Sequence, residues 1–196
     1  MTKKHLPNLL SLSRILLTPI FLYFLFLSDY KHSELTAALI FTIASITDAF
    51  DGKLARQYNL VTRMGVFLDP LADKFLILSA FFSFAILGDV HLWMVLLISF
   101  RDILVTALRT MMELKGITMI TSKVGKLKTL LQIIIINVIF IYMILKGYGF
   151  TEYSSIFIRF EIINVLMLLT TSVTIYTGIH YFYYNHQSIK MLIIRK

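Results

Sequence analysis

Long apolar runs dominate the chain, and short polar segments separate them. The runs are too long for transmembrane strands and lack a two-residue alternation, so they indicate helices. Because about 20 mostly apolar residues cross a bilayer as a helix, the pattern predicts six transmembrane spans. These lie at roughly 9–28, 35–56, 67–87, 90–112, 124–145 and 160–183. We therefore expect an all-α polytopic membrane protein with a single domain, residues 1–196.

The amino-terminal stretch MTKKHLPNLLSLSRILLTPIF begins like a secretory signal peptide, with basic residues before an apolar run. The run continues to residue 28, which makes it longer than the core of a usual signal peptide. No cleavage site made of small residues follows it. We expect this stretch to form a first membrane span that stays in the protein.

The composition agrees with a membrane protein, since 58% of the residues are hydrophobic and the mean hydropathy is +0.79. The sequence has no cysteine, which excludes disulfides, thiolate metal sites and a cysteine nucleophile. A net charge of +8 is typical of many nucleic-acid-binding proteins. The positions of the charges favour a different partner.

Basic residues gather on one side of the predicted membrane. With the amino terminus in the cytoplasm, only Lys31, Lys146 and Arg159 of the 19 basic residues fall on the far side. This asymmetry is the one expected for cytoplasmic loops, and six spans return the carboxyl terminus to the same side. A basic membrane face attracts lipid headgroups and phosphate-bearing substrates. We expect both termini in the cytoplasm, membrane phospholipids as partners and no nucleic acid.

Four aspartates lie close together in the stretch DAFDGKLARQYNLVTRMGVFLDPLAD. Asp48 and Asp51 are three residues apart in the second predicted helix, and Asp69 and Asp73 are four apart in the third, so each pair shares a helix face. A short loop joins the two helices, which makes them antiparallel neighbours. We expect the two pairs to face each other across one cytoplasmic cleft.

Four carboxylates in one cleft repel each other unless cations or protons compensate them. An all-oxygen ligand set suits Mg²⁺ or Mn²⁺, and four carboxylates are enough for two ions that clamp a phosphoryl group. Two structural alternatives remain open. Asp69 can cap a helix that begins at Pro70, and Asp48 or Asp51 can pair with Arg56 or Lys74. Acids inside a membrane are functional by default, which favours the metal site.

The residues around the aspartates form a longer pattern: Asp, two residues, Asp-Gly, two residues, Ala-Arg, eight residues, Gly, three residues, Asp, three residues, Asp. This pattern resembles the signature of the CDP-alcohol phosphatidyltransferases at every defined position, and the six-span size fits that family too. The resemblance implies an enzyme in which an alcohol hydroxyl attacks the lipid-side phosphorus of CDP-diacylglycerol and CMP leaves.

The resemblance also assigns roles to the residues of the pattern. The four aspartates would hold two divalent ions, Mg²⁺ or Mn²⁺, and Asp73 would also act as the general base for the hydroxyl. Arg56 can grip a diphosphate in a fork, and small residues let a ligand approach the helix backbone. The residues expected to bind the CDP-lipid are Asp48, Asp51, Gly52, Ala55, Arg56 and Gly65.

The alcohol acceptor must be recognised elsewhere. Arg101 and Arg109 are eight residues apart in the fourth predicted helix, which is about 12 Å along one side of it. Lysines at 123, 126 and 128 open the fifth helix on the same membrane side. Together these cations can bind a second phosphate, and this favours a phosphorylated acceptor. The alternative is that they only mark the cytoplasmic side or form the local pairs Arg101–Asp102 and Arg109–Glu113.

The spacing of Arg101 and Arg109, the following GKLKT, the opening PNLLSLSRILLTPIF and the phrase FLDPLADK look like those of bacterial phosphatidylglycerophosphate synthases. That resemblance implies sn-glycerol 3-phosphate as the acceptor, a homodimer, and a place in the bacterial cytoplasmic membrane with the active site facing the cytoplasm. It assigns the acceptor phosphate to Arg101, Arg109 and Lys126. Weaker candidates are Asn8, Arg14, Lys123 and Lys128, and Arg14 can instead extend toward the membrane interface.

Other functions stay open at this point. The same chemistry can use inositol phosphate, serine or phosphatidylglycerol as the alcohol. A metal-ion transporter with an acidic site and a purely structural membrane protein are rivals from other classes. Two further expectations concern packing: Gln132 and Asn137 should form hydrogen bonds between helices, and residues 181–184 should form an aromatic belt at the headgroups.

Overall fold

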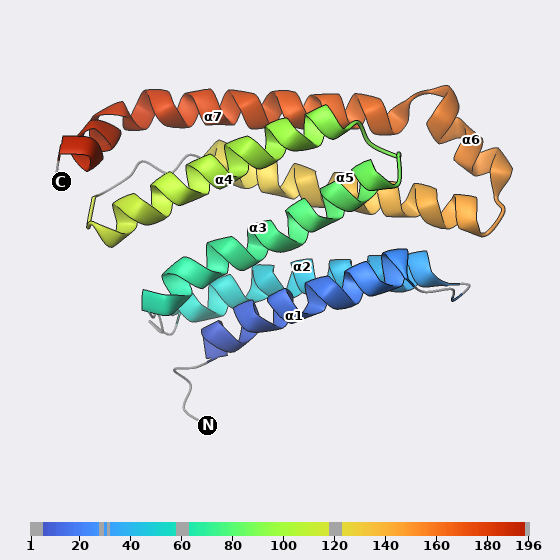
Figure 1. Cartoon of the computed structure of the whole chain (residues 1–196), viewed down its shortest axis with the longest axis horizontal. Coiled ribbons are helices and arrows are strands. Elements are labelled where there is room, and N and C mark those ends of the chain that lie inside the picture. Colours follow the sequence, from blue (N-terminus) through green and yellow to red (C-terminus); the bar gives the residue numbers. More distant parts are fainter. Residues whose placement is uncertain (1–5, 28–29, 31, 58–62, 118–122, 195–196) are drawn as a thin grey trace.

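The structure is a computed structural model that describes residues 6–27, 30, 32–57, 63–117 and 123–194 (Figure 1). Side chains are described for residues 14–27, 30, 32–47, 72, 74–117, 125 and 127–192. The described residues form helices and no strand, which confirms the all-α prediction. The helices are α1 (Leu6–Phe26), α2 (Ser33–Gln57), α3 (Arg63–Ile86), α4 (Leu92–Leu114), α5 (Lys123–Gly147), α6 (Thr151–Arg159) and α7 (Ile162–Ile194).

Six of these helices correspond to the six predicted spans, and two features differ from the prediction. The short helix α6 was not expected, because its nine residues mix polar and apolar positions and form no long apolar run. Helix α7 continues to Ile194, beyond the predicted end at residue 183. Four polar residues, 185–188, follow the predicted end, so the continuous apolar run stops before the helix does.

The long helices run back and forth along the longest axis of the molecule (Figure 1). Helix α1 packs against α2 and α3, α4 packs against α3 and α7, and α5 contacts both α2 and α7. The first turn of α1 and the last turn of α7 lie toward one end of the bundle, together with the last turns of α2 and α4 and the first turns of α3 and α5. We call this the terminal end. The antiparallel course predicted for the second and third helices is confirmed (Figure 1).

A cluster of four packed aromatic rings stabilises the half of the bundle that lies away from the terminal end. The ring of Phe140 on α5 lies 6.0 Å from Phe21 of α1, 5.9 Å from Phe41 of α2 and 5.1 Å from Phe84 of α3, measured between ring centroids. All four rings are buried. Rings at such distances and tilts attract each other beyond the effect of burying their area. The cluster therefore holds the helices that carry the acidic stretch against α5.

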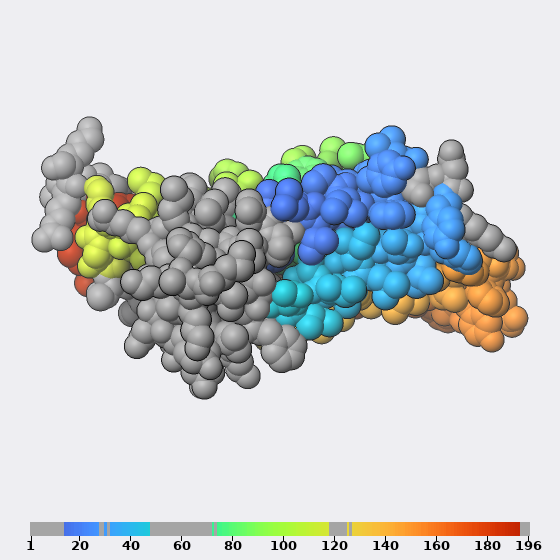
Figure 2. All heavy atoms as spheres, turned by 90° about the horizontal axis from the view of Figure 1, so that it is seen from below, coloured from blue at the N-terminus to red at the C-terminus, as the bar shows by residue number. Residues whose placement is uncertain are grey.

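The surface of the bundle is apolar, and its interior contains polar groups. Helices α1 and α2 form the near face in Figure 2, and both expose large apolar side chains such as Leu16 and Ile43. Buried threonines donate hydrogen bonds to backbone carbonyls of their own helix. Thr171 Oγ1, for example, donates to the Met167 carbonyl at 2.8 Å. Exposed apolar side chains on this scale would make a soluble protein aggregate, whereas lipid solvates them.

The lengths of the apolar segments support the same conclusion in part. Within the described side chains, residues 127–147 and 162–192 are long and apolar enough to cross a membrane by length and composition. Shorter apolar helical segments lie at residues 14–26, 33–47 and 74–86. The apolar helices therefore indicate a membrane protein, while the six-span topology stays a prediction.

Candidate active site

The acidic stretch lies on two helices that meet at the terminal end. Asp48 and Asp51 belong to the second half of α2, and Asp69 and Asp73 belong to the first half of α3. The backbone is helical at all four positions, so the three- and four-residue spacings place each pair on one helix face. Their side chains lie outside those that the structure describes, and the convergence of the four carboxylates stays a prediction.

The capping alternative for Asp69 is wrong. Helix α3 begins at Arg63, so both Asp69 and Pro70 lie inside the helix and not at its start. Pro70 has no backbone N–H, and at this position it removes a hydrogen bond from the helix interior. The start of α3 therefore gives no structural reason for an aspartate at position 69.

The donor set of the acidic stretch fits hard divalent cations. Four carboxylates are available from two helices, and carboxylate oxygens are preferred ligands of Mg²⁺ and Mn²⁺. Among the side chains that the structure describes, no group of three or more His, Cys, Asp or Glu residues lies close enough to hold a metal. The acidic stretch, whose side chains lie outside the described part, is therefore our candidate metal site.

A second group of charged side chains surrounds the carboxylate of Asp102 on α4. Asp102 is fully buried, and its Oδ1 accepts hydrogen bonds from Lys128 Nζ and, at 3.2 Å, from Arg101 Nη1. Its Oδ2 accepts a hydrogen bond from Gln132 Nε2 at 3.1 Å and lies 3.6 Å from Lys74 Nζ. We call these five residues the Asp102 cluster. It joins α3, α4 and α5.

The Asp102 cluster has more positive than negative charge. It contains one carboxylate and three cations, and the side chains of Lys74, Arg101 and Lys128 are 14%, 15% and 2% exposed. Arg101 Nε is buried and has no hydrogen-bond partner among the described residues. Burying a donor without a partner is costly. The Arg101 side chain is therefore suited to binding an anion.

The side chain of Arg101 also packs against α7. A Cβ atom built on Gly178 would lie 2.9 Å from Arg101 Cγ and 3.3 Å from Arg101 Nε, which is too close for any side chain at position 178. Tyr181 lies one turn further along α7, within reach of the charges of Arg101 and Arg109. Residues from α7 therefore complete the surroundings of the two arginines.

The two arginines differ in exposure. Arg101 is partly buried and forms the local pair with Asp102 that the sequence left open. Arg109 is exposed, and among the described side chains it forms no ion pair with Glu113. The pair with Asp102 therefore neutralises part of the charge of Arg101. Among the described side chains, Glu113 does not neutralise the charge of Arg109.

The structure describes the side chains of two weaker candidates, Arg14 and Lys128. Arg14 is only 3% exposed, and its carbonyl accepts a hydrogen bond from Thr18 Oγ1 at 2.9 Å, so the alternative in which it extends to the membrane interface does not fit. Lys128 is buried in the Asp102 cluster. The side chains of the other candidates lie outside the described part, namely Asn8, Gly52, Ala55, Arg56, Gly65, Lys123 and Lys126.

The predicted hydrogen bonds between helices are confirmed. Gln132 of α5 donates to Asp102 of α4, and Asn137 Oδ1 of α5 accepts a hydrogen bond from Thr42 Oγ1 of α2 at 2.8 Å. Sequence reasoning gave Asp102 no role beyond a local partner of Arg101. The signal that could have found it is the one used for the other aspartates, an acid inside an apolar span.

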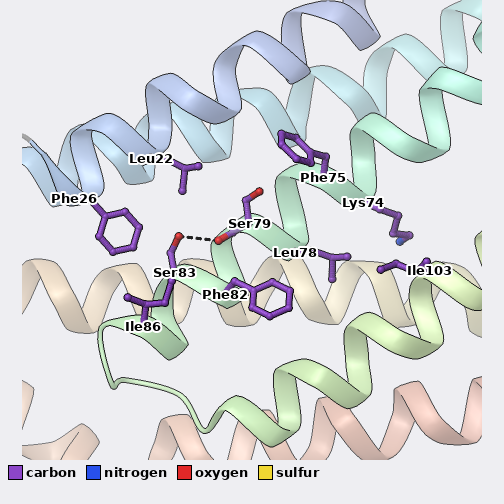
Figure 3. A pocket seen from close by; sticks show the side chains of 10 residues that line it. All are labelled: Leu22, Phe26, Lys74, Phe75, Leu78, Ser79, Phe82, Ser83, Ile86 and Ile103. Atoms are coloured by element: carbon purple, nitrogen blue, oxygen red, sulfur yellow. Dashed lines mark hydrogen bonds between the residues drawn. The ribbon is translucent and has the colours of Figure 1, made fainter.

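An apolar cavity of about 490 Å³ opens between α1, α3 and α4 (Figure 3). Phe26 and Ile86 lie toward one end of it, and Lys74 lies at the other. Lys74 is the one charged residue of its ten-residue lining, and it directly follows Asp73 in the sequence. An apolar wall that leads to a cation beside the acidic stretch is suited to a ligand with an apolar chain and an anionic head.

Comparisons with known proteins agree on one family. A family profile described as CDP-alcohol phosphatidyltransferase matches residues 4–177. A CDP-diacylglycerol–glycerol-3-phosphate 3-phosphatidyltransferase of Rickettsia typhi is 35% identical over 91% of this chain and 96% of its own length. The protein of the same name in Bacillus subtilis is 33% identical over 95% and 97% of the two chains.

A probable phosphatidylglycerophosphate synthase of Mycobacterium tuberculosis is 43% identical over 68% of this chain, and the match spans 64% of that protein's length. The family profile includes all four aspartates of the acidic stretch as well as the whole Asp102 cluster. The match extends over most of the chain, and two relatives are similar along nearly their whole length. The chain therefore belongs to the CDP-alcohol phosphatidyltransferase family.

Proposed function

We propose that the protein transfers the phosphatidyl group of CDP-diacylglycerol to a hydroxyl of sn-glycerol 3-phosphate, giving phosphatidylglycerophosphate and CMP. The observation that carries the choice of acceptor is the state of Arg101. Its Nη1 donates a hydrogen bond to Asp102, while its buried Nε has no partner among the described residues. A phosphate on the acceptor would satisfy that donor. The names of the Rickettsia and Bacillus relatives support the same substrate pair.

The proposed topology has six spans, α1 to α5 and α7, with both termini in the cytoplasm of a bacterial cell. Helix α6 has nine residues, too few to cross a bilayer, and would lie at the opposite membrane surface. The terminal end then faces the cytoplasm, where the water-soluble acceptor and CMP are found. The homodimer expected from the family resemblance is part of the proposal.

The proposed chemistry is a substitution at phosphorus. The acceptor hydroxyl oxygen forms a bond to the lipid-side phosphorus, the bond from that phosphorus to the oxygen of CMP breaks, and CMP leaves with the electron pair. The hydroxyl proton passes to the carboxylate of Asp73. Asp48, Asp51, Asp69 and Asp73 would hold two divalent ions, Mg²⁺ or Mn²⁺, which when bound neutralise the diphosphate and the leaving group.

The remaining residues bind and orient the substrates. Arg56, with the small residues Gly52, Ala55 and Gly65, would contact the nucleotide and its diphosphate. Arg101, Arg109 and Lys126 would hold the acceptor phosphate, so that its hydroxyl reaches the lipid-side phosphorus. Holding two reactants in this way supplies most of the rate in phosphoryl-type transfers. Supporting roles are proposed for Asn8, Arg14, Lys123 and Lys128.

The test is CMP release by purified protein in detergent with CDP-diacylglycerol and Mg²⁺. Four reactions are compared, with glycerol 3-phosphate, inositol phosphate, serine and no acceptor, each with and without EDTA. We expect release only with glycerol 3-phosphate and only without EDTA. Release with a different acceptor would refute the acceptor assignment and keep the chemistry. Release that is indifferent to EDTA would refute the role of the divalent ions.

A further inference from the structure

The Asp102 carboxylate lies between the two halves of the proposed site. Lys74 directly follows Asp73 on α3, and Arg101 belongs to the acceptor half on α4. Both cations contact the same buried carboxylate, Arg101 through Nη1 at 3.2 Å and Lys74 through Nζ at 3.6 Å. We propose that Asp102 is a positioning residue that sets the proton acceptor on α3 and the phosphate-binding arginine on α4 in a fixed relation. This inference rests on the proposed function.

The first argument is that Asp102 can hold its partners in one geometry. A carboxylate has about four lone-pair positions, and here four groups occupy the two oxygens. Oδ1 accepts from Arg101 and Lys128, and Oδ2 accepts from Gln132 and lies beside Lys74. Charge-assisted hydrogen bonds in a buried site are strong and directional. A side chain with all its acceptor positions used has little freedom to move.

The second argument concerns the rotation of α3. Successive residues of an α-helix point about 100° apart around the axis. Lys74 is bound to α4 through Asp102, and this contact limits the rotation of α3 about its axis. Asp73 precedes Lys74 in the same helix, so its direction from the helix axis is limited as well. A rotation of α3 that turned Asp73 away would have to break the contact between Lys74 and Asp102.

The third argument concerns Arg101. The side chain of Arg101 fills the space beside Gly178 of α7, and its guanidinium is bound to Asp102. Asp102 cannot bind the acceptor phosphate itself, since both are anions. Its contribution to phosphate binding must therefore act through Arg101, and this makes it a positioning residue and not a ligand.

A purely structural role is the alternative, in which Asp102 only neutralises buried lysines and holds α4 to α5. The variants Asp102→Asn and Gln132→Leu distinguish the two. Both remove interactions from the same buried cluster and should lower the melting temperature. Gln132→Leu leaves the contacts of Asp102 with Arg101 and Lys74 in place, whereas Asp102→Asn removes the charge that holds both.

The measurement is steady-state CMP release by full-length protein in detergent, with KM for glycerol 3-phosphate and kcat determined separately. We expect Asp102→Asn to lower kcat/KM for glycerol 3-phosphate by about 10- to 100-fold, since displacements near 1 Å have effects of that size. Gln132→Leu should raise KM much less than Asp102→Asn does, because the charge of Asp102 and its contacts with Arg101 and Lys74 remain, and Asp102→Glu, which keeps the carboxylate, should recover part of the loss. Wild-type kcat/KM in folded Asp102→Asn, or equal losses in Asp102→Asn and Gln132→Leu, would overturn the proposal.

Lys74→Met provides a test that does not depend on the folding of Asp102→Asn. It cuts the contact between α3 and Asp102 and leaves Arg101 in place, so kcat should fall while KM for glycerol 3-phosphate stays unchanged. An unchanged kcat would overturn the inference. The proposed function is judged separately on the wild-type protein: if another acceptor releases CMP, the variants are compared with that acceptor. Absence of CMP release by folded wild type with every acceptor overturns both.

Discussion

Adding a side chain at Gly178 tests the proposed acceptor site, because Arg101 of that site fills the space beside this glycine. In Gly178→Ala the new Cβ atom would lie 2.9 Å from Arg101 Cγ and 3.3 Å from Arg101 Nε. Non-bonded carbon atoms prefer separations of about 3.5–4.0 Å, so the Arg101 side chain must shift by roughly 0.6–1 Å. The clash involves Cγ as well as Nε, so rotation of the guanidinium alone does not relieve it.

The shift has a calculable consequence for activity. A misplacement near 1 Å can cost up to about 100-fold in rate or binding, so we expect KM for glycerol 3-phosphate to rise by about 10- to 100-fold. Alanine favours a helix interior over glycine by roughly 0.5–1 kcal/mol, and the overpacking costs about 1–3 kcal/mol, so the variant should lose at most about 2.5 kcal/mol of stability. We therefore expect Gly178→Ala to fold and to need higher concentrations of glycerol 3-phosphate for saturation.

The assay is CMP release at a series of glycerol 3-phosphate concentrations, with melting temperature measured on the same preparations. Gly147→Ala is the matched control, since it makes the same exchange in another helix, where the added Cβ would meet the Glu34 carboxylate at an ordinary 3.4 Å. It lies at the end of α5 away from the site and should leave KM unchanged. A wild-type KM in folded Gly178→Ala would refute the reasoning that Arg101 is held between Gly178 and Asp102.

Three further predictions test other parts of the molecule. Asp73→Asn should keep the fold, judged by melting temperature, and abolish CMP release because the proton acceptor is lost; near-normal turnover would contradict its role as the base. Arg109→Ala should mainly raise KM for glycerol 3-phosphate, since Arg109 is exposed and contributes little to packing; an unchanged KM would remove it from the acceptor site. Phe140→Ala should destabilise the bundle by about 3–5 kcal/mol through the loss of a buried ring, seen as a lower denaturation midpoint, and equal stability would contradict the role of the aromatic cluster.

Some features of this protein follow from local properties of the chain. Helix formation in an apolar run depends on backbone groups satisfying each other within that run, so six of the helices could be predicted, five of them with both ends within four residues of the observed ones. The aspartate pattern likewise needs no tertiary knowledge, because its spacing within two helices defines the faces. Gln132 and Asn137 were predicted as partners between helices for a similar reason, since an amide in an apolar span requires a hydrogen bond.

Other features depend on helices that are distant in the sequence. The continuous apolar run ends near residue 183 and four polar residues, 185–188, follow it, yet α7 continues to Ile194, and Leu192 is buried beside Met112 of α4. The nine residues of α6 carry too little apolar sequence to predict a helix. In both cases tertiary contacts stabilise a helix that its own composition does not indicate.

The same division holds for the candidate site. The sequence by itself determined the family, the acidic stretch and the arginines, because these are patterns of spacing along one or two neighbouring helices. Only the tertiary structure decided that Asp102 is shared by Lys74, Arg101 and Lys128, and that Gly178 leaves the space that Arg101 fills. These contacts join residues of four helices, and the physical reason they escape sequence analysis is that burial and charge balance are properties of the assembled bundle.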